Sequence, residues 1–446
     1  MEQNWGGSEP GRLARLWLLQ HSMRYAFFGD GSRWPGLEPD RLYGCDAAAA
    51  ASSDGGRSVP RLAWVDRARG LGITLVVAGH VLGGIVAAAL VSDRGVAVRT
   101  IDVIYSFHMP LFFFVSGLLA ETRSRSPAAG AFVVGKLRTL AWPYLLWSVV
   151  QVALHWLASP VANHRVDTSA LLRLAWEPVE QFWFLYVLFV LSVGWSLLRR
   201  TGATAPALLG AAALIYFVPG HVGLGSWGVL YMVASNAVWF AAGAAIGAVR
   251  LWRVLDEWPL PLVTSAMLFA LLRSLALQGF GSPSATGELA LDMLRCGIAA
   301  MGIVASLLFA TALERAVQRV RALRSAAGKV PGRSRIRRAT SVIVHAPAHL
   351  VALLAVAALH LGEASLAIYL AHTIFAAATR VALVRIGAVG DPLVHLVCGS
   401  AAGLLIPLVL DRVCTRAGLR WIFKFPSARR GQAANSSFVA GALEGA

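Results

Sequence analysis

Long stretches without charge constrain this chain more than any other feature of its sequence. Between Leu71 and Val91 there is no Lys, Arg, Asp or Glu, so about 20 residues can cross a bilayer as a helix. Similar stretches recur along the chain, and only 14% of its residues are charged, against about 25% in a typical soluble domain. The sequence therefore predicts an all-α, polytopic integral membrane protein.

We expect about ten transmembrane helices. The fifth is short and is interrupted by Pro219 and Gly220, and one further apolar stretch, residues 341–361, is not counted as a span. The expected spans cover approximately residues 71–91, 101–120, 141–158, 181–198, 206–219, 228–249, 259–278, 296–314, 365–386 and 392–411.

The Lys and Arg residues indicate which side faces the cytoplasm. They cluster in alternate segments, whereas the intervening loops hold few of them. Under the positive-inside rule, ten spans place every basic segment and both termini in the cytoplasm. We expect the membrane to be the cell membrane, as a bacterial inner membrane. An eleventh span at 341–361 would move the basic C-terminal tail outside, so we interpret that stretch as re-entrant or interfacial. The same rule explains the net charge of +17 without a nucleic-acid partner.

The chain divides into a transmembrane domain and basic flanking segments. Residues 1–60 are expected to form a cytoplasmic tail that is poorly ordered or lies on the membrane surface, and residues 61–412 to form the transmembrane domain. Within this domain, 315–340 is expected to be a basic cytoplasmic loop, and 413–446 is a basic cytoplasmic tail. The four cysteines are scattered with no CxxC pair, so neither a disulfide framework nor a metal site is indicated.

The first span carries two groups of chemical interest. Arg69 and His80 are 11 residues apart, so they share one helix face and are separated by roughly 16 Å along the axis. A histidine near mid-membrane indicates a functional site, although it can also be a neutral group bonded to a neighbouring helix. Arg69 at the cytoplasmic mouth suits a phosphate-bearing ligand, or is an ordinary positive-inside anchor.

A second histidine follows in the next span. His108 is about seven residues into it, roughly 10 Å deep, and Pro110 is expected to bend the helix there. In the ninth span, Tyr369 and His372 are one turn apart. These two residues, with Arg380 two turns further on, could line the same cavity or serve as structural hydrogen-bonding groups. Glu180, at the outer end of the fourth span, fits a sugar contact and equally a solvated rim.

Two motifs together resemble the membrane acyltransferase 3 family, which O-acylates carbohydrates of the cell envelope. They are DRARGLGITLVVAGH at 66–80 and SFHMPLFFFVSGLL at 106–119. The family signature, an Arg and a His with ten residues between them, is matched by Arg69 and His80. Asp66 stands three residues before the Arg. Further matches in family order are PYLLWS at 143–148, FWFLYVLFVLS at 182–192 and LGEASLAIYLAH at 361–372.

The resemblance implies an acyl-CoA, expected to be acetyl-CoA, as cytoplasmic co-substrate, with no bound cofactor. The acceptor would be a hydroxyl of an envelope glycan, glycolipid or glycosylated metabolite. Arg69 would bind the donor's phosphates, with Lys136 and Arg138 standing where the family often has a paired-Arg motif. His80 and His108 would be catalytic, since histidine titrates near neutrality, with His80 as base or acyl carrier. Residues that could line the cavity are Asp66, Ser116, Glu180, Tyr369, His372 and Arg380.

A protein of another class also fits the composition. A multi-pass transporter or flippase of a lipid or metabolite would use buried histidines for proton relay or substrate binding and would carry out no covalent chemistry.

The expected topology can be tested by cysteine labelling at Ala339, Glu363 and Gly431. All three positions should react only from the cytoplasmic side, because the basic segments are retained inside and 341–361 does not cross. Labelling of Gly431 from outside would contradict the ten-span arrangement.

Overall fold

The computed structural model describes most of the chain between residues 62 and 425. The expected tail 1–60, much of the tail 413–446 and part of the loop 315–340 lie outside the described residues. The described ranges are 62–91, 93–120, 129–157, 171–217, 228–257, 262–277, 285–328, 346–387 and 391–425.

The described residues form helices and connecting turns, with no strand among them, which confirms the all-α prediction. The α-helices are α2 (Ala63–Ala87), α3 (Arg94–Tyr105), α4 (His108–Leu118), α6 (Ala129–Lys136), α7 (Trp142–Leu157), α8 (Trp183–Arg200), α9 (Ala205–Phe217), α10 (Val229–Ile246), α11 (Ala248–Glu257), α12 (Leu262–Leu277), α13 (Ala285–Gly328), α15 (Ala346–Glu363), α16 (Ser365–Arg385) and α17 (Pro392–Arg416). Short elements are the π-helical turn η2 (Leu137–Ala141) and the 3-10 turns η4 (Glu180–Phe182) and η6 (Arg420–Ile422).

The predicted spans correspond to these helices. Within the described residues, eight helical segments are long and apolar enough to cross a membrane. The fifth and seventh predicted spans correspond to two shorter apolar helices, Ala205–Phe217 and Leu262–Ser274. The prediction of a polytopic protein with roughly ten spans is therefore confirmed.

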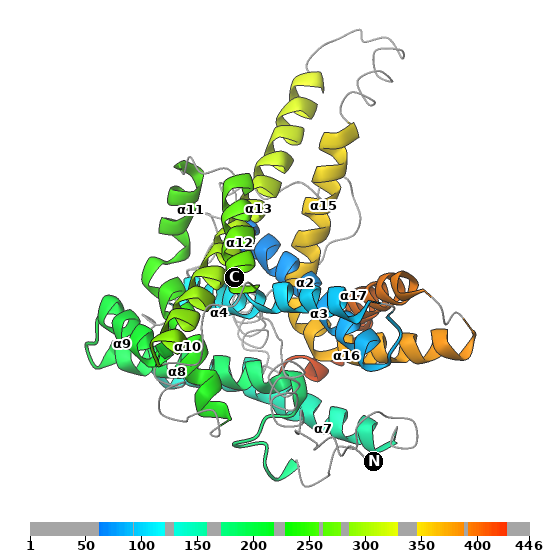
Figure 1. Ribbon diagram of the computed structural model, residues 1–446, viewed down its shortest axis with the longest axis horizontal. Coiled ribbons are helices and arrows are strands. Elements are labelled where there is room, and N and C mark those ends of the chain that lie inside the picture. Colours follow the sequence, from blue (N-terminus) through cyan, green and yellow to red (C-terminus); the bar gives the residue numbers. More distant parts are fainter. Residues whose placement is uncertain are drawn as a thin grey trace, which may run out of the picture.

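Helix α2 lies at the centre of the molecule, in contact with α3, α4, α13, α15, α16 and α17 (Figure 1). This position follows from its sequence, because hydrocarbon cannot solvate charged groups and other helices must cover them. The first turns of α2 show the effect directly, since Asp66, Arg67 and Arg69 are all buried.

Glycines allow other helices to approach the α2 backbone closely. A Cβ on Gly70 would overlap the carbonyl of Ala358 in α15, and one on Gly362 would overlap the carbonyl of Asp66. Further along α2, the ring of Tyr105 packs on Gly79. Small residues at helix interfaces are the usual means of tight packing in membranes, where no hydrophobic effect drives the helices together.

The second predicted span is two helices with a break between them. Helix α3 ends at Tyr105 and α4 begins at His108, so the chain bends at residues 106 and 107. The break is the expected effect of Pro110, which lacks the N–H that would bond to the carbonyl of Ser106 in a continuous helix. His108 is thus the first residue of α4 instead of an interior residue of one long helix.

Helices α13 and α15 project together from the rest of the molecule (Figure 1). Their contact is a separate apolar cluster of Leu313, Val317, Val320, Ala352 and Ala355. Residues 315–328, which are predicted to lie in a basic loop, instead continue the helix α13. The apolar stretch predicted to be re-entrant or interfacial contains most of α15, which packs on this extension and on the first turns of α2. Its position relative to the membrane stays a prediction.

The α2–α15 crossing provides a stability test. Gly70→Ala should lower the free energy of unfolding by about 1–3 kcal/mol, because a new Cβ meets backbone that cannot yield. The midpoint of thermal unfolding in detergent should fall accordingly. Gly83→Ala on the same helix is the matched control, since nothing lies within 4 Å of its added Cβ. Equal midpoints for the two variants would show that the close approach at Gly70 does not stabilise the fold.

Candidate active site

The beginning of α2 holds a buried cluster of ion pairs. Arg69 donates from Nη1 to Oδ1 of Asp66 at 2.9 Å, and both side chains are less than a tenth exposed. Arg67 pairs with Glu314 of α13. A guanidinium has five N–H donors, so the bond to Asp66 orients Arg69 while leaving it capable of binding a further anion. Each of the two guanidinium groups at this end of α2 is thus paired with a carboxylate.

Further along the same face of α2, His80 lies within a row of aromatic rings. Its ring centroid is 5.0 Å from that of His372 in α16 and 6.5 Å from that of Tyr105 in α3. The Tyr105 ring is in turn 5.0 Å from the ring of His108. On the other side, Tyr369 lies 6.2 Å from His372. The structure thus brings together four predicted residues, with Tyr105 between His80 and His108. The four are His80, His108, Tyr369 and His372.

Backbone hydrogen bonds fix the tautomers of two of the three histidines. His108 uses Nδ1 to reach the carbonyl of Ile104 at 2.6 Å, across the break between α3 and α4. His372 uses Nδ1 to reach the carbonyl of Tyr369 at 2.8 Å. A carbonyl only accepts, so Nδ1 must carry the proton in each ring. In the neutral ring, Nε2 then has the lone pair, which is the form a general base requires.

Residues before α8 connect this row of rings to α7. Tyr369 donates its hydroxyl proton to the carbonyl of Gln181, and Nε2 of Gln181 donates to Oγ1 of Thr373 at 3.0 Å. Next to it, the carboxylate of Glu180 accepts from Gln151 at 2.8 Å and contacts Nε2 of His155 at 3.1 Å. Glu180 has a φ of 42°, in the left-handed region that a non-glycine residue rarely adopts. The predicted cavity residue Glu180 therefore belongs to a polar cluster next to the rings.

The other predicted residues lie apart from this row or at its edge. Lys136 places Nζ 5.5 Å from the Phe132 ring, and the guanidinium of Arg138 lies 5.7 Å from the Phe425 ring. Ser116 is two turns along α4 from His108, beside the Gly117 that packs on α10. Arg380 lies against α2 at Gly84, where an added Cβ would overlap its Nη1 atom. The donor-binding role of Lys136 and Arg138 and the cavity role of Ser116 stay predictions.

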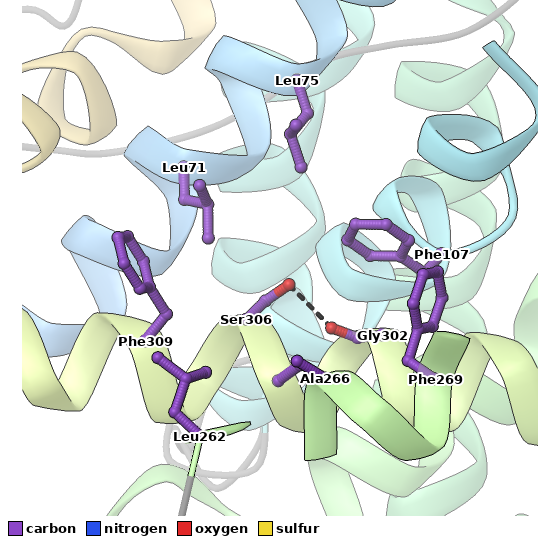
Figure 2. Close-up of a pocket in the computed structure, with 10 residues that line it drawn as sticks. Leu71, Leu75, Phe107, Leu262, Ala266, Phe269, Gly302, Ser306 and Phe309 are labelled. Atoms are coloured by element: carbon purple, nitrogen blue, oxygen red, sulfur yellow. Dashed lines mark hydrogen bonds between the residues drawn. The ribbon is translucent and has the colours of Figure 1, made fainter. Parts of the chain in front are cut away.

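An apolar cavity of about 290 Å³ lies on the opposite face of α2 (Figure 2). Leu71 and Leu75 face it, and on a regular helix they point roughly 140–180° away from His80. Phe107, from the break before His108, packs on Gly302 of α13 and closes one side. The cavity can take hydrocarbon, but its position excludes it from the chemistry around His80.

Several residues of the site were not among the predicted site residues. Tyr105, Gln181, Thr373 and His155 join the site through contacts with helices distant in the chain. The pairing of Arg67 with Glu314 spans 247 residues. For Tyr105, the available signal was a polar aromatic residue three positions before an intramembrane histidine.

The sequence of the chain is similar to those of known proteins. A family model described as an acyltransferase domain matches residues 62–412. The nodulation protein NolL of Mesorhizobium japonicum is 29% identical over 125 residues, which cover 28% of this chain and 32% of that protein. The match thus spans about a third of the relative's length. No solved structure matches the chain.

Proposed function

The chain belongs to the acyltransferase-domain family, and on that premise we propose that it transfers an acyl group, expected to be acetyl, from acyl-CoA to a hydroxyl of an envelope glycan, glycolipid or glycosylated metabolite. The family model covers residues from just before α2 to the last turns of α17, so the proposal applies to the whole transmembrane region. The donor would approach from the end of α2 that carries Arg69.

One observation carries the proposal: a half-buried histidine lies among proton-transfer groups from three other helices. His80 has His372 on one side and Tyr105 with His108 on the other. His108 and His372 are fully buried, at 0% exposure, in a membrane protein that gains nothing in stability from such groups unless they bond or react.

The chemistry follows from the balance of the reaction. The acceptor oxygen attacks the thioester carbonyl carbon, the C–S bond breaks, and the acyl group ends on oxygen as an ester. The hydroxyl proton is taken by a ring nitrogen of neutral His80 and returned to the leaving thiolate, which departs as CoA thiol. A base placed in this way typically accelerates the reaction by about 10²–10⁴.

The two ends of the α2 face would then serve the two substrates. Arg69, oriented by Asp66, would bind the phosphates of CoA, and the flexible arm would carry the thioester toward His80 roughly 16 Å away. The acceptor would enter from the far half of α2, past His108. This division supports transfer across the membrane, with each substrate on its own side.

The alternative is a transporter or flippase that leaves its substrate unchanged. Buried histidines fit both classes, and the match of residues 62–412 to an acyltransferase domain favours the enzyme. A gain in mass of the acceptor that depends on acyl-CoA separates the two, because transport adds no atoms.

His80 is the first residue to test. His80→Ala should insert and fold normally yet lose acyl transfer by at least about 10², because the hydroxyl proton has no acceptor. The loss should appear in turnover, not in acyl-CoA binding, which relies on Arg69. Radiolabelled acetyl-CoA with purified protein in nanodiscs gives both quantities.

His108→Ala is the comparison for that experiment. It should impair acceptor use more than hydrolysis of the thioester, since His108 lies one ring beyond Tyr105 from His80. A folded His80→Ala protein that acylates at the normal rate would exclude His80 as the base and would shift the chemistry to His108 or His372.

A second test concerns the donor end. Arg69→Ala should weaken acyl-CoA binding by about tenfold or more, and Arg69→Lys should restore only part, because an ammonium cannot form the two-pronged contact. Removing Arg69 also leaves Asp66 buried without this partner, so the double variant Asp66→Asn/Arg69→Gln keeps the site neutral. Titration of acyl-CoA measures the effect.

Arg94→Ala is the matched control, because this arginine is exposed at the start of α3. Donor affinity that stays unchanged in Arg69→Ala and in the double variant would remove Arg69 from the donor site.

A further inference from the structure

Against the half of α2 beyond His80 lies a cation from α16 whose position calls for an anion. The guanidinium of Arg380 lies on Gly84, where an added Cβ would overlap its Nη1 atom. Among the described residues, no hydrogen bond or ion pair involves the Arg380 side chain. A guanidinium in a membrane span normally pairs with another group, so a missing partner indicates a ligand.

Arg380 reaches toward His80 because of the direction of its helix. It is two turns after His372 in α16, and long side chains of a helix lean toward its N-terminus. The guanidinium therefore meets α2 at Gly84, one turn beyond His80, a separation of roughly 6 Å along the axis. Gly84 and His80 share a face of α2, as do His80 and Arg69. Cations thus stand at both ends of the face, with the histidine between them.

A second unsatisfied group lies on the adjacent helix α17. Gly403 packs on Val77 and Gly399 packs on Val81. Helix α17 therefore runs antiparallel to α2, and successive contacts are four residues apart in both helices. The next turn in this register puts His395 level with Gly84 and Ile85. His395 is 2% exposed, and neither of its ring nitrogens has a hydrogen-bond partner among the described residues. A buried polar group without a partner costs free energy unless a ligand satisfies it.

We propose that Arg380, with His395 beside it, binds a phosphate or carboxylate of the acceptor and holds the acceptor hydroxyl at His80. The inference rests on the proposed function for what happens at His80, but the anion site itself is a property of Arg380 and His395. The forked guanidinium matches the planar geometry of both anions. The distance to His80 suits an anionic group on the acylated sugar or on its neighbour.

The same chemistry could come from the phosphate of a membrane lipid. The contact with Gly84 favours the acceptor, because it turns the guanidinium toward α2 and the histidine face instead of toward the bilayer. The dependence of the unfolding temperature on phospholipid separates the two sources.

The experiment compares methyl glucuronide with methyl glucoside, which differ at one carboxylate, as ligands of the full chain in phosphatidylcholine nanodiscs without acyl-CoA. Wild type should bind the glucuronide about tenfold or more tightly than the glucoside. Arg380→Gln should abolish this preference, Arg380→Lys should retain part of it, and His395→Ala should reduce it severalfold. Arg385→Gln, exposed in the last turn of the same helix, should behave as wild type.

A wild type without carboxylate preference, or a preference that survives in Arg380→Gln, overturns the inference. So does a third result: Arg380→Gln lowers the unfolding temperature in phospholipid nanodiscs but not in maltoside detergent, and leaves glucuronide binding unchanged. That pattern assigns the cation to a lipid phosphate.

Transfer from labelled acetyl-CoA to both sugars is measured in parallel. Loss of carboxylate preference in Arg380→Gln, without acetyl transfer in any protein, keeps the anion site and contradicts the proposed function. Acetyl transfer together with an unchanged carboxylate preference in Arg380→Gln supports the proposed function and contradicts the anion site.

Discussion

The structure depends on one constraint: hydrocarbon cannot solvate the polar groups of α2, so other helices must surround them. Charged residues at its start and a histidine in its interior would each be expensive against lipid. Instead, α3, α4, α13, α15, α16 and α17 pack on α2, which buries the charged residues and half-buries His80. The glycines of α2 make this possible, since Gly70, Gly79 and Gly84 admit a backbone, a ring and a guanidinium in turn. The same contacts that make α2 tolerable in the membrane assemble the candidate site.

The break between α3 and α4 has a similar double effect. Pro110 interrupts the helix, and the ring of His108 takes a carbonyl of the preceding turn as its partner. The bend also brings Tyr105 between His80 and His108. Phe107, at the same bend, points into the apolar cavity on the other face. A single residue that cannot donate a hydrogen bond therefore arranges side chains on two sides of α2.

Much of the fold was predictable because its signals are local. Charge-free stretches locate the spans, and the spacing of Arg69 and His80 puts both on one face. What could not be predicted depends on contacts between distant segments. The Tyr369 hydroxyl reaches Gln181 across 188 residues, and Arg67 reaches Glu314 across 247. Periodicity says which face is polar but not which helix covers it, so Arg380 and His395 could be placed at one level of α2 only with the structure.

The central claim is that α2 supports acyl transfer between substrates on opposite sides of a membrane. It is tested most directly in sealed proteoliposomes of uniform orientation, with isotope-labelled acetyl-CoA on one side and a glycan acceptor on the other, by mass spectrometry of the acceptor. The account predicts a labelled acetyl mass gain when the donor is on the side of Arg69, and none when the two compartments are exchanged. Acceptor that crosses the membrane with its mass unchanged, or label that appears only when both substrates share a compartment, would contradict it.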